Sequence, residues 1–174
     1  FAGKDIIVAT GSKPVRLPLP GFEKTIEACD YLNGVKDVKK NVVVIGGGLT
    51  GCEVAYELAL QGKKVSIVEG KQDLCPQTGV CLANSSYLRE WFALNNVPVY
   101  LNTFLKEVKD KEIICADVDG KEISIKCDSV ISCVGYKPSP AFEASGKVHL
   151  VGDCLKVGNL RSVVWRAYEV AMKI

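Results

Sequence analysis

The sequence predicts an α/β fold: a parallel sheet with helices on one face and a three-stranded antiparallel meander on the other. A run of β-branched residues at 41–46 leads into a glycine-rich turn and a helical pattern, and a second apolar strand pattern follows at 63–70. Fully apolar strands of this kind are typical of a parallel sheet buried on both faces. Between residues 104 and 134 the apolar positions alternate instead, which indicates three short antiparallel strands with a hairpin turn at 117–122.

The elements before this sheet are short. Residues 4–12 form an apolar strand that ends in a glycine turn. Residues 13–22 hold three prolines, which excludes a central strand or a helix and predicts a linker. Residues 23–38 are weakly helical, and 27–34 is the strongest part of that pattern.

Helices and strands alternate through the rest of the chain. The helix after the glycine turn stops near Gly62, and the next helix, at 84–96, is capped by Asn84 or Ser85. Further strands are expected at 97–102, 127–136 and 147–154, a second proline-rich linker at 136–146, and a last helix at 159–174.

Composition excludes several classes of protein. The chain has 174 residues, 48% of them hydrophobic, and a formal net charge of +2 with no basic block, so nucleic acid is not an expected partner. No apolar run approaches the roughly 18–20 residues of a membrane span, and no signal segment is present. Because Phe1 stands where an initiator Met would be, we expect a piece of a longer protein.

Eight cysteines favour a reduced, cytoplasmic protein over a secreted disulfide scaffold, since several lie inside apolar strand patterns. No C-x-x-C pair occurs, so no metal site is expected. Cys52 lies at a helix N-terminus, a place that lowers a thiol pKa. We nevertheless expect Cys52 to pack against the neighbouring strand.

The glycine turn has the spacing G-x-G-x-x-G and joins a strand to a helix, as in a Rossmann-like unit. Its first glycine permits a tight turn, its second admits a pyrophosphate, and its third lets the helix pack close to the strand. The N–H groups of the first helical turn would face the phosphates. The expected site residues are Gly46, Gly48, Leu49, Thr50 and Gly51. The alternative is a tight strand–helix joint without a ligand.

Glu69 ends the second strand, 18 residues after Gly51. An acidic side chain there accepts hydrogen bonds from the adenosine ribose and repels a 2′-phosphate. The cofactor expected is therefore NAD(H) in preference to NADP(H), although Lys71 nearby offers a cation that could partner a phosphate.

Four segments together, "IIVATGSKPVRLPLPG", "VVVIGGGLTGCEVAYELALQGKKVSIVE", "SVISCVGYKPSP" and "HLVGDC", resemble the pyridine nucleotide–disulfide oxidoreductases. Within that superfamily the chain is most similar to the C-terminal region of NADH:flavin oxidoreductases such as 2,4-dienoyl-CoA reductase and enoate reductase. The resemblance implies an NAD(H)-binding domain inserted into an FAD-binding domain. The implied parts are an FAD-domain remnant at 1–20, a connector at 21–40, the NAD(H) domain at 41–137 and a second FAD-domain remnant at 138–174.

The resemblance also assigns residues to the flavin side of the site. Thr10 and Gly11 belong to the crossing from the FAD domain, and Gly152 and Asp153 to a segment whose aspartate bonds the flavin's ribityl chain. The first glycine motif of the family is missing from the chain. FAD is therefore expected only in the intact parent, and the chain alone should be colourless.

The same resemblance places Glu53 and Gly135 near the nicotinamide. A first-turn acid such as Glu53 also favours the helix dipole, so its role stays open. No catalytic residue is expected in the chain itself, because the flavin carries the chemistry. The chain alone should have no turnover.

The function implied is binding of NADH and delivery of hydride to FAD in the parent. One alternative is a structural module that holds ADP or a dinucleotide without hydride transfer. Another is a disulfide reductase fragment, although Cys75 and Cys81, with five residues between them, do not form the C-x-x-x-x-C pair of that class. The expected partner is the missing FAD and barrel portion, or a second copy through exposed surfaces of the two remnants.

Overall fold

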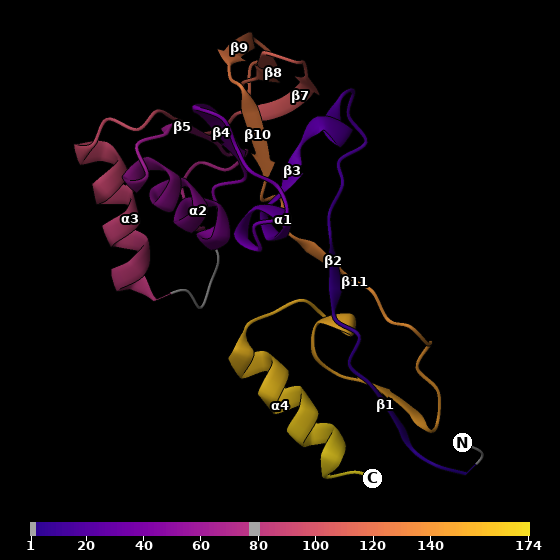
Figure 1. Cartoon of the computed structure of the whole chain (residues 1–174). Helices are drawn as coiled ribbons and strands as arrows, with labels where there is room; N and C mark the ends of the chain where they lie inside the picture. The colour runs from indigo at the N-terminus through magenta and orange to yellow at the C-terminus, as the bar shows by residue number, and fades with distance from the viewer. Residues whose placement is uncertain (1–2, 77–80) are drawn as a thin grey trace. The chain divides into compact units, whose positions relative to one another are not determined.

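The computed structural model describes residues 3–76 and 81–174, which divide into two compact units. Unit 2 is one continuous stretch, Arg16–Val134. Unit 1 combines the two ends of the chain, Phe1–Val15 and Gly135–Ile174 (Figure 1).

Unit 2 is built on a five-stranded sheet in which every pairing is parallel. The apolar run predicted as the first strand forms its centre, with Val42, Val43 and Val44 almost fully buried. In spatial order the strands are β3 (Ile26–Glu27), β10 (Ser129–Ser132), β4 (Asn41–Ile45), β5 (Lys64–Val68) and β6 (Val99–Tyr100).

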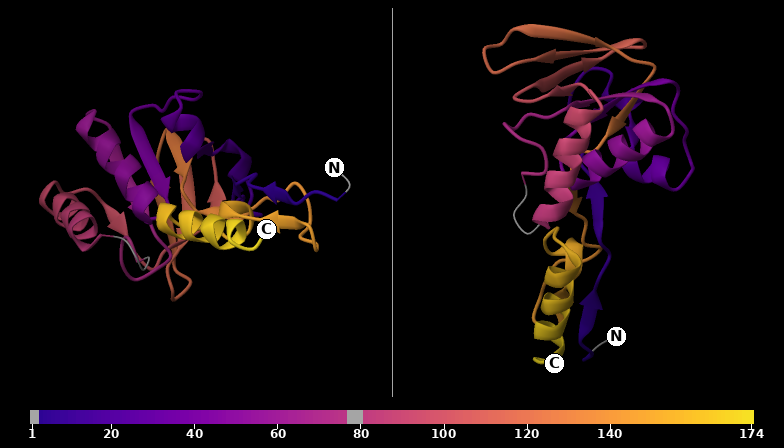
Figure 2. Two further views of the ribbon diagram at one scale, coloured as in Figure 1. Left: turned by 90° about the horizontal axis from the view of Figure 1, so that it is seen from below. Right: turned by 90° about the vertical axis from the view of Figure 1, so that its left-hand side faces the viewer.

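Three helices cover one face of this sheet: α1 (Ala28–Leu32), α2 (Leu49–Leu60) and α3 (Leu82–Leu94). Leu58 and Phe92 are among the largest side chains buried between the helices and the strands. Figure 2 shows the helices gathered on one side of unit 2.

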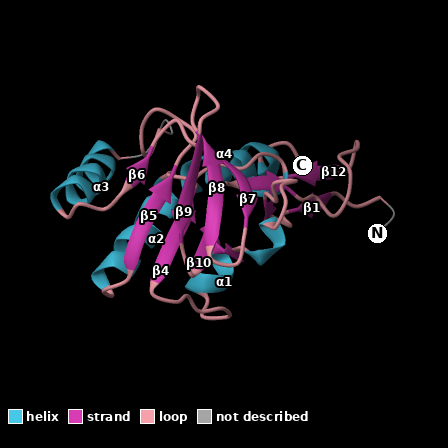
Figure 3. Ribbon diagram, turned by 90° about the horizontal axis from the view of Figure 1, so that it is seen from above, coloured by secondary structure: helices cyan, strands magenta, loops and turns pink. Residues whose placement is uncertain are grey.

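The opposite face carries the meander β7 (Phe104–Val108), β8 (Glu112–Ala116) and β9 (Glu122–Lys126), whose pairings are antiparallel (Figure 3). Its inward side chains form a second core with Val43, Ile45 and Val68 of the sheet. The Asp117 carboxylate closes the β8–β9 hairpin by accepting from the Asp119 and Lys121 N–H groups. The predicted fold class is therefore confirmed.

Unit 1 contains two small strand pairs, a turn and a helix. Strands β1 (Ile6–Val8) and β12 (Val148–Leu150) are parallel, and β2 (Ser12–Pro14) and β11 (Tyr136–Pro138) are antiparallel. A 3-10 turn, η2 (Gly152–Cys154), and helix α4 (Leu160–Ala171) follow.

Two local predictions were wrong, and a third was right only in part. Each proline-rich stretch is a connection apart from one short edge strand, a position that tolerates a residue without an N–H, so the exclusion of a central strand was correct. Helix α3 begins at Leu82, so neither Asn84 nor Ser85 is its cap. The strand predicted at 147–154 ends at Leu150, since Gly152 has φ +66° and starts a turn.

The weakly helical stretch before β4 also contains η1 (Phe22–Lys24) and β3, which extends the parallel sheet. Across residues 3–76 and 81–174, none of the helices has the length and apolar character needed to cross a membrane.

Candidate functional site

At two positions of the glycine loop between β4 and α2, backbone atoms leave no room for a side chain. Gly46 has φ +101°, and a Cβ there would collide with the Cys133 carbonyl. A Cβ on Gly51 would overlap the carbonyl oxygen of Gly46. The first and third glycines of the motif thus allow the strand, the turn and the helix to come together.

Helix α2 opens at this loop with Gly48 as its N-cap, and no side chain in the described part of the chain caps it. The first N–H groups of a helix have no partner within the helix. The amides of Leu49 and Thr50 are among them, and the helix dipole adds partial positive charge at this end. The arrangement is suited to a phosphate or pyrophosphate.

Glu69 directly follows β5 and lies beside the glycine loop. One carboxylate oxygen accepts from the Gly47 N–H at 2.5 Å, and the other accepts from the Lys71 N–H at 2.9 Å. The acid is therefore fixed next to the glycine turn, a position from which a carboxylate can accept hydrogen bonds from a ribose.

The Gly47 carbonyl is anchored on the inner side of the loop. It accepts from the Cys75 N–H at 2.7 Å and from the Cys52 thiol at 3.3 Å. Cys52 has no exposed surface, and burial raises its pKa far above the ordinary value. The helix N-terminus does not activate this thiol, and the expectation that Cys52 packs in the core is confirmed.

The remaining predicted residues lie elsewhere. Glu53 is exposed on α2, within unit 2. It is the fifth residue of the helix and lies beyond the first turn, so the alternative role as a first-turn acid was wrong. Unit 1 holds the others: Thr10, Gly11, Gly135, Gly152 and Asp153.

Within unit 1 the two predicted flavin-side segments meet. The Asp153 carboxylate accepts from the Ser12 hydroxyl at 3.3 Å and from the Gly158 N–H at 3.1 Å. The Thr10 hydroxyl donates to the Ser139 carbonyl at 2.9 Å. His149, the single histidine, contacts Asp5 at 2.9 Å, a structural pairing as expected.

No sequence pattern identified the segment 71–75, which packs against one side of the glycine loop. The Leu74 side chain lies so close to Gly47 that a Cβ on this glycine would meet its Cδ2 at 2.5 Å. No spacing pattern marks this contact, since Leu74 belongs to an irregular stretch after β5.

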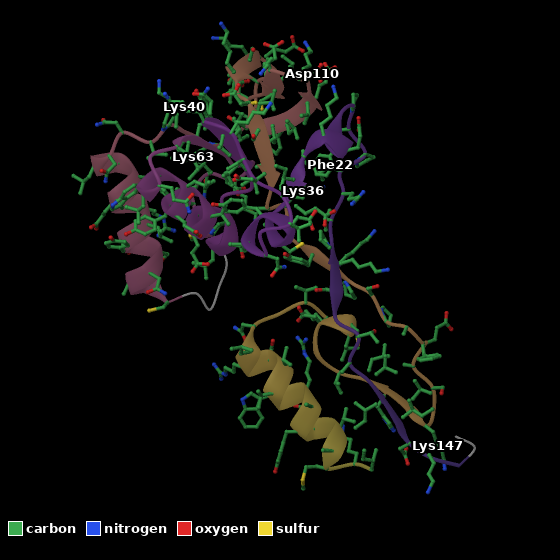
Figure 4. The ribbon with its side chains drawn as sticks, in the orientation of Figure 1. Phe22, Lys36, Lys40, Lys63, Asp110 and Lys147 are labelled. Atoms are coloured by element: carbon green, nitrogen blue, oxygen red, sulfur yellow. The ribbon has the colours of Figure 1, made fainter. Side chains whose placement is uncertain are left out.

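One group of side chains has the composition of a metal site: ligand atoms of Glu27, Cys29 and Asp30 lie within 4.8 Å of one another. Both carboxylates already have cationic partners, Arg16 at 2.7 Å from Glu27 and Lys36 at 3.3 Å from Asp30. Figure 4 shows Lys36 beside α1. We assign no metal to this group.

Comparison with known proteins identifies the family of the chain. The profile of the pyridine nucleotide-disulphide oxidoreductase family matches residues 1–158. Cinnamate reductase from Clostridium sporogenes is 34% identical over the whole chain, and an NADH oxidase from Thermoanaerobacter brockii is 30% identical over 97% of it. The chain spans 27% and 28% of these two relatives, about a quarter of their length.

Among solved structures, a 2-naphthoyl-CoA reductase superposes with a TM-score of 0.83 at 27% identity. The match covers 97% of this chain and 26% of the reductase. The chain therefore belongs to the pyridine nucleotide-disulphide oxidoreductase family and is related to its enoate-reductase-type flavoproteins.

Proposed function

We propose that unit 2 binds NADH and that the full-length protein uses it to reduce FAD. One observation carries the proposal: the Glu69 carboxylate lies hydrogen-bonded to a glycine loop that opens an uncapped helix. An anion site and a ribose acceptor thus occupy adjacent positions, which is what the ADP half of a dinucleotide requires.

The negative charge of the Glu69 carboxylate favours NADH over NADPH. A 2′-phosphate would bring its negative charges to the Glu69 carboxylate. Lys71 contacts this carboxylate through its main-chain N–H, which every residue except proline has, so the lysine ammonium takes no part in that contact. Repulsion between like charges at close range lowers affinity for the phosphorylated cofactor.

The relatives support a redox role without fixing its substrate. One is named an NADH oxidase and another a cinnamate reductase, and both are about four times longer than this chain. In the full-length protein Asp153 would offer an acceptor to the FAD ribityl chain, since its carboxylate is already oriented by Ser12 and Gly158. The NADH hydride would supply the electrons, and this chain would position its donor.

Binding is tested by calorimetric titration of the chain with NADH, NADPH and ADP. We expect NADH and ADP to bind at one site and to compete, with NADPH at least tenfold weaker. Failure of both NADH and ADP to bind would overturn the assignment of the glycine loop as a dinucleotide site.

Hydride transfer is tested in the full-length protein by anaerobic titration with NADH while the flavin absorption is followed. Bleaching at one equivalent of NADH per flavin is expected, and prior saturation with ADP should slow it. Tight NADH binding with no bleaching would instead support a structural nucleotide module.

A further inference from the structure

We infer that Arg89, on helix α3, is a positioning residue of the dinucleotide site and contributes to its preference for NADH. The inference rests on the proposed function, because it concerns the same site. Arg89 does not touch the glycine loop itself. It acts through the segment 71–75, which lies between α3 and the loop.

Arg89 holds this segment at two adjacent points. Its Nε donates to the Asp73 carboxylate at 2.9 Å, and its Nη2 donates to the Leu74 carbonyl at 2.5 Å. The planar guanidinium satisfies both acceptors at once, which a lysine ammonium does less well. An exposed Arg–Asp pair alone contributes little to stability, so the contact to the carbonyl distinguishes Arg89 from an ordinary surface ion pair.

The segment in turn shapes both features of the proposed site. Cys75 donates its N–H to the Gly47 carbonyl at 2.7 Å, and the Leu74 side chain packs against Gly47. Lys71 donates its N–H to Glu69 at 2.9 Å. The 71–75 segment thus makes two contacts with Gly47 of the glycine loop and one with Glu69.

The backbone conformation of this segment depends on stabilising contacts from residues outside it. Cys75 has φ +47°, a left-handed conformation that non-glycine residues adopt at a cost. Such a conformation persists when surrounding contacts determine it. The Arg89 contact to Leu74, directly before Cys75, is one of these contacts.

Removal of Arg89 should therefore loosen Leu74 and Cys75 and, through the Cys75 N–H, the Gly47 backbone, whose N–H is one of the two donors that fix Glu69. The other donor, Lys71, is held independently of Arg89, because its carbonyl accepts from the Asn102 N–H at 2.9 Å. A carboxylate held only by Lys71 can rotate away from the ribose. NADH then loses an acceptor, whereas NADPH loses a repulsive neighbour. The ratio of the two affinities should fall, which a general loss of stability would not cause.

The test compares Arg89→Ala, Arg89→Lys and the control Phe92→Leu in the chain of residues 1–174. Phe92 lies in the core on the same helix. Its variant therefore destabilises α3 but keeps the Arg89 hydrogen bonds to Asp73 and Leu74. We expect Arg89→Ala to weaken NADH binding about fivefold and to lower the NADH-to-NADPH affinity ratio about fivefold. Arg89→Lys should recover part of this ratio, and Phe92→Leu should leave the ratio unchanged.

A second readout needs no nucleotide. Hydrogen exchange at the Cys75 amide should quicken at least tenfold in Arg89→Ala and stay near the rate of the unmodified chain in Phe92→Leu. Unchanged exchange, or equal losses of NADH and NADPH affinity, would overturn the inference. If the unmodified chain of residues 1–174 failed to bind NADH while its hydrogen exchange responded to Arg89→Ala as expected, the proposed function would fail. The positioning of the 71–75 segment by Arg89 would then stand.

Discussion

The Glu69 carboxylate accepts a hydrogen bond from the Gly47 N–H at 2.5 Å, which ties the end of β5 to the turn between β4 and α2. Hydrogen bonds to an ionised acceptor are shorter and stronger than neutral ones. The contact keeps a negative charge beside the helix N-terminus, although the two residues are 22 positions apart. A ligand in the loop would meet both groups together.

Replacement of Glu69 with Gln should weaken NADH binding about tenfold, which corresponds to about 1.4 kcal/mol. The amide keeps the size of the side chain but removes its charge and one acceptor. NADPH affinity should rise or stay constant, since the repulsion is gone. Fluorescence titration of both cofactors measures the change.

Glu90→Gln is the matched control, because Glu90 lies exposed on α3. It should alter neither affinity by more than twofold. Equal effects of the two variants would show that Glu69 acts only through the net charge of the chain.

Gly51→Ala should destabilise unit 2 by about 2–3 kcal/mol and abolish nucleotide binding. The new Cβ would overlap the Gly46 carbonyl, a backbone atom that moves only with the whole turn. Urea denaturation followed by circular dichroism measures the loss.

Gly62→Ala serves as its control. Gly62 has φ +78°, and no atom of the described residues lies within 4 Å of a new Cβ, so the cost of Gly62→Ala is the backbone strain alone, about 1–2 kcal/mol. This variant should still bind NADH. Loss of binding in both variants would mean that general destabilisation explains the Gly51 result.

The sheet and the loop could be predicted from the sequence because their signals are local. The run 41–45 is apolar and β-branched, the glycines follow it directly, and the helical spacing begins at once. Alternation likewise marked the meander strands.

Other features depend on contacts that no local pattern records. Strand β3 has two residues, too few for any periodicity, and exists because β10 lies beside it. Ser85 resembled a cap, yet its hydroxyl donates to the Leu82 carbonyl from inside the first turn of α3. The role of Arg89 depends on where α3 meets the stretch after β5.

Asn159→Ala should destabilise helix α4 in unit 1 by about 1 kcal/mol. The Asn159 side chain accepts from the Ser162 N–H at 3.0 Å, and the Ser162 hydroxyl accepts from the Asn159 N–H at 3.0 Å. Removing the side chain breaks this capping box. Hydrogen exchange of the α4 amides should quicken about fivefold.

Asn84→Ala tests the same substitution where the sequence suggested a cap and the structure places none. Asn84 is the third residue of α3, and alanine has the higher helix propensity there. The variant should be neutral or slightly stabilising. A loss equal to that of Asn159→Ala would contradict the assigned start of α3.

As the pH is raised, the chain should lose stability at a lower pH than its lysine content alone predicts, because its buried thiols resist ionisation. Burial raises the pKa of Cys115 and Cys127 to about 11 and that of Cys133 to about 12, from 9.0 in an exposed thiol. Above pH 9 the unfolded chain releases protons that the folded chain retains. Its stability therefore falls between pH 9 and pH 11–12, by at most about 1.4 kcal/mol per pH unit for each thiol.

Urea midpoints at pH 8, 9 and 10 under reducing conditions measure this slope, and Cys115→Ala isolates one thiol. The variant is less stable at pH 8, since Cys115 is fully buried in the meander core. Between pH 9 and pH 10, however, it should lose less stability than the parent, because one group no longer ionises on unfolding. Parallel slopes for the two proteins would show that Cys115 does not stay protonated in the folded state.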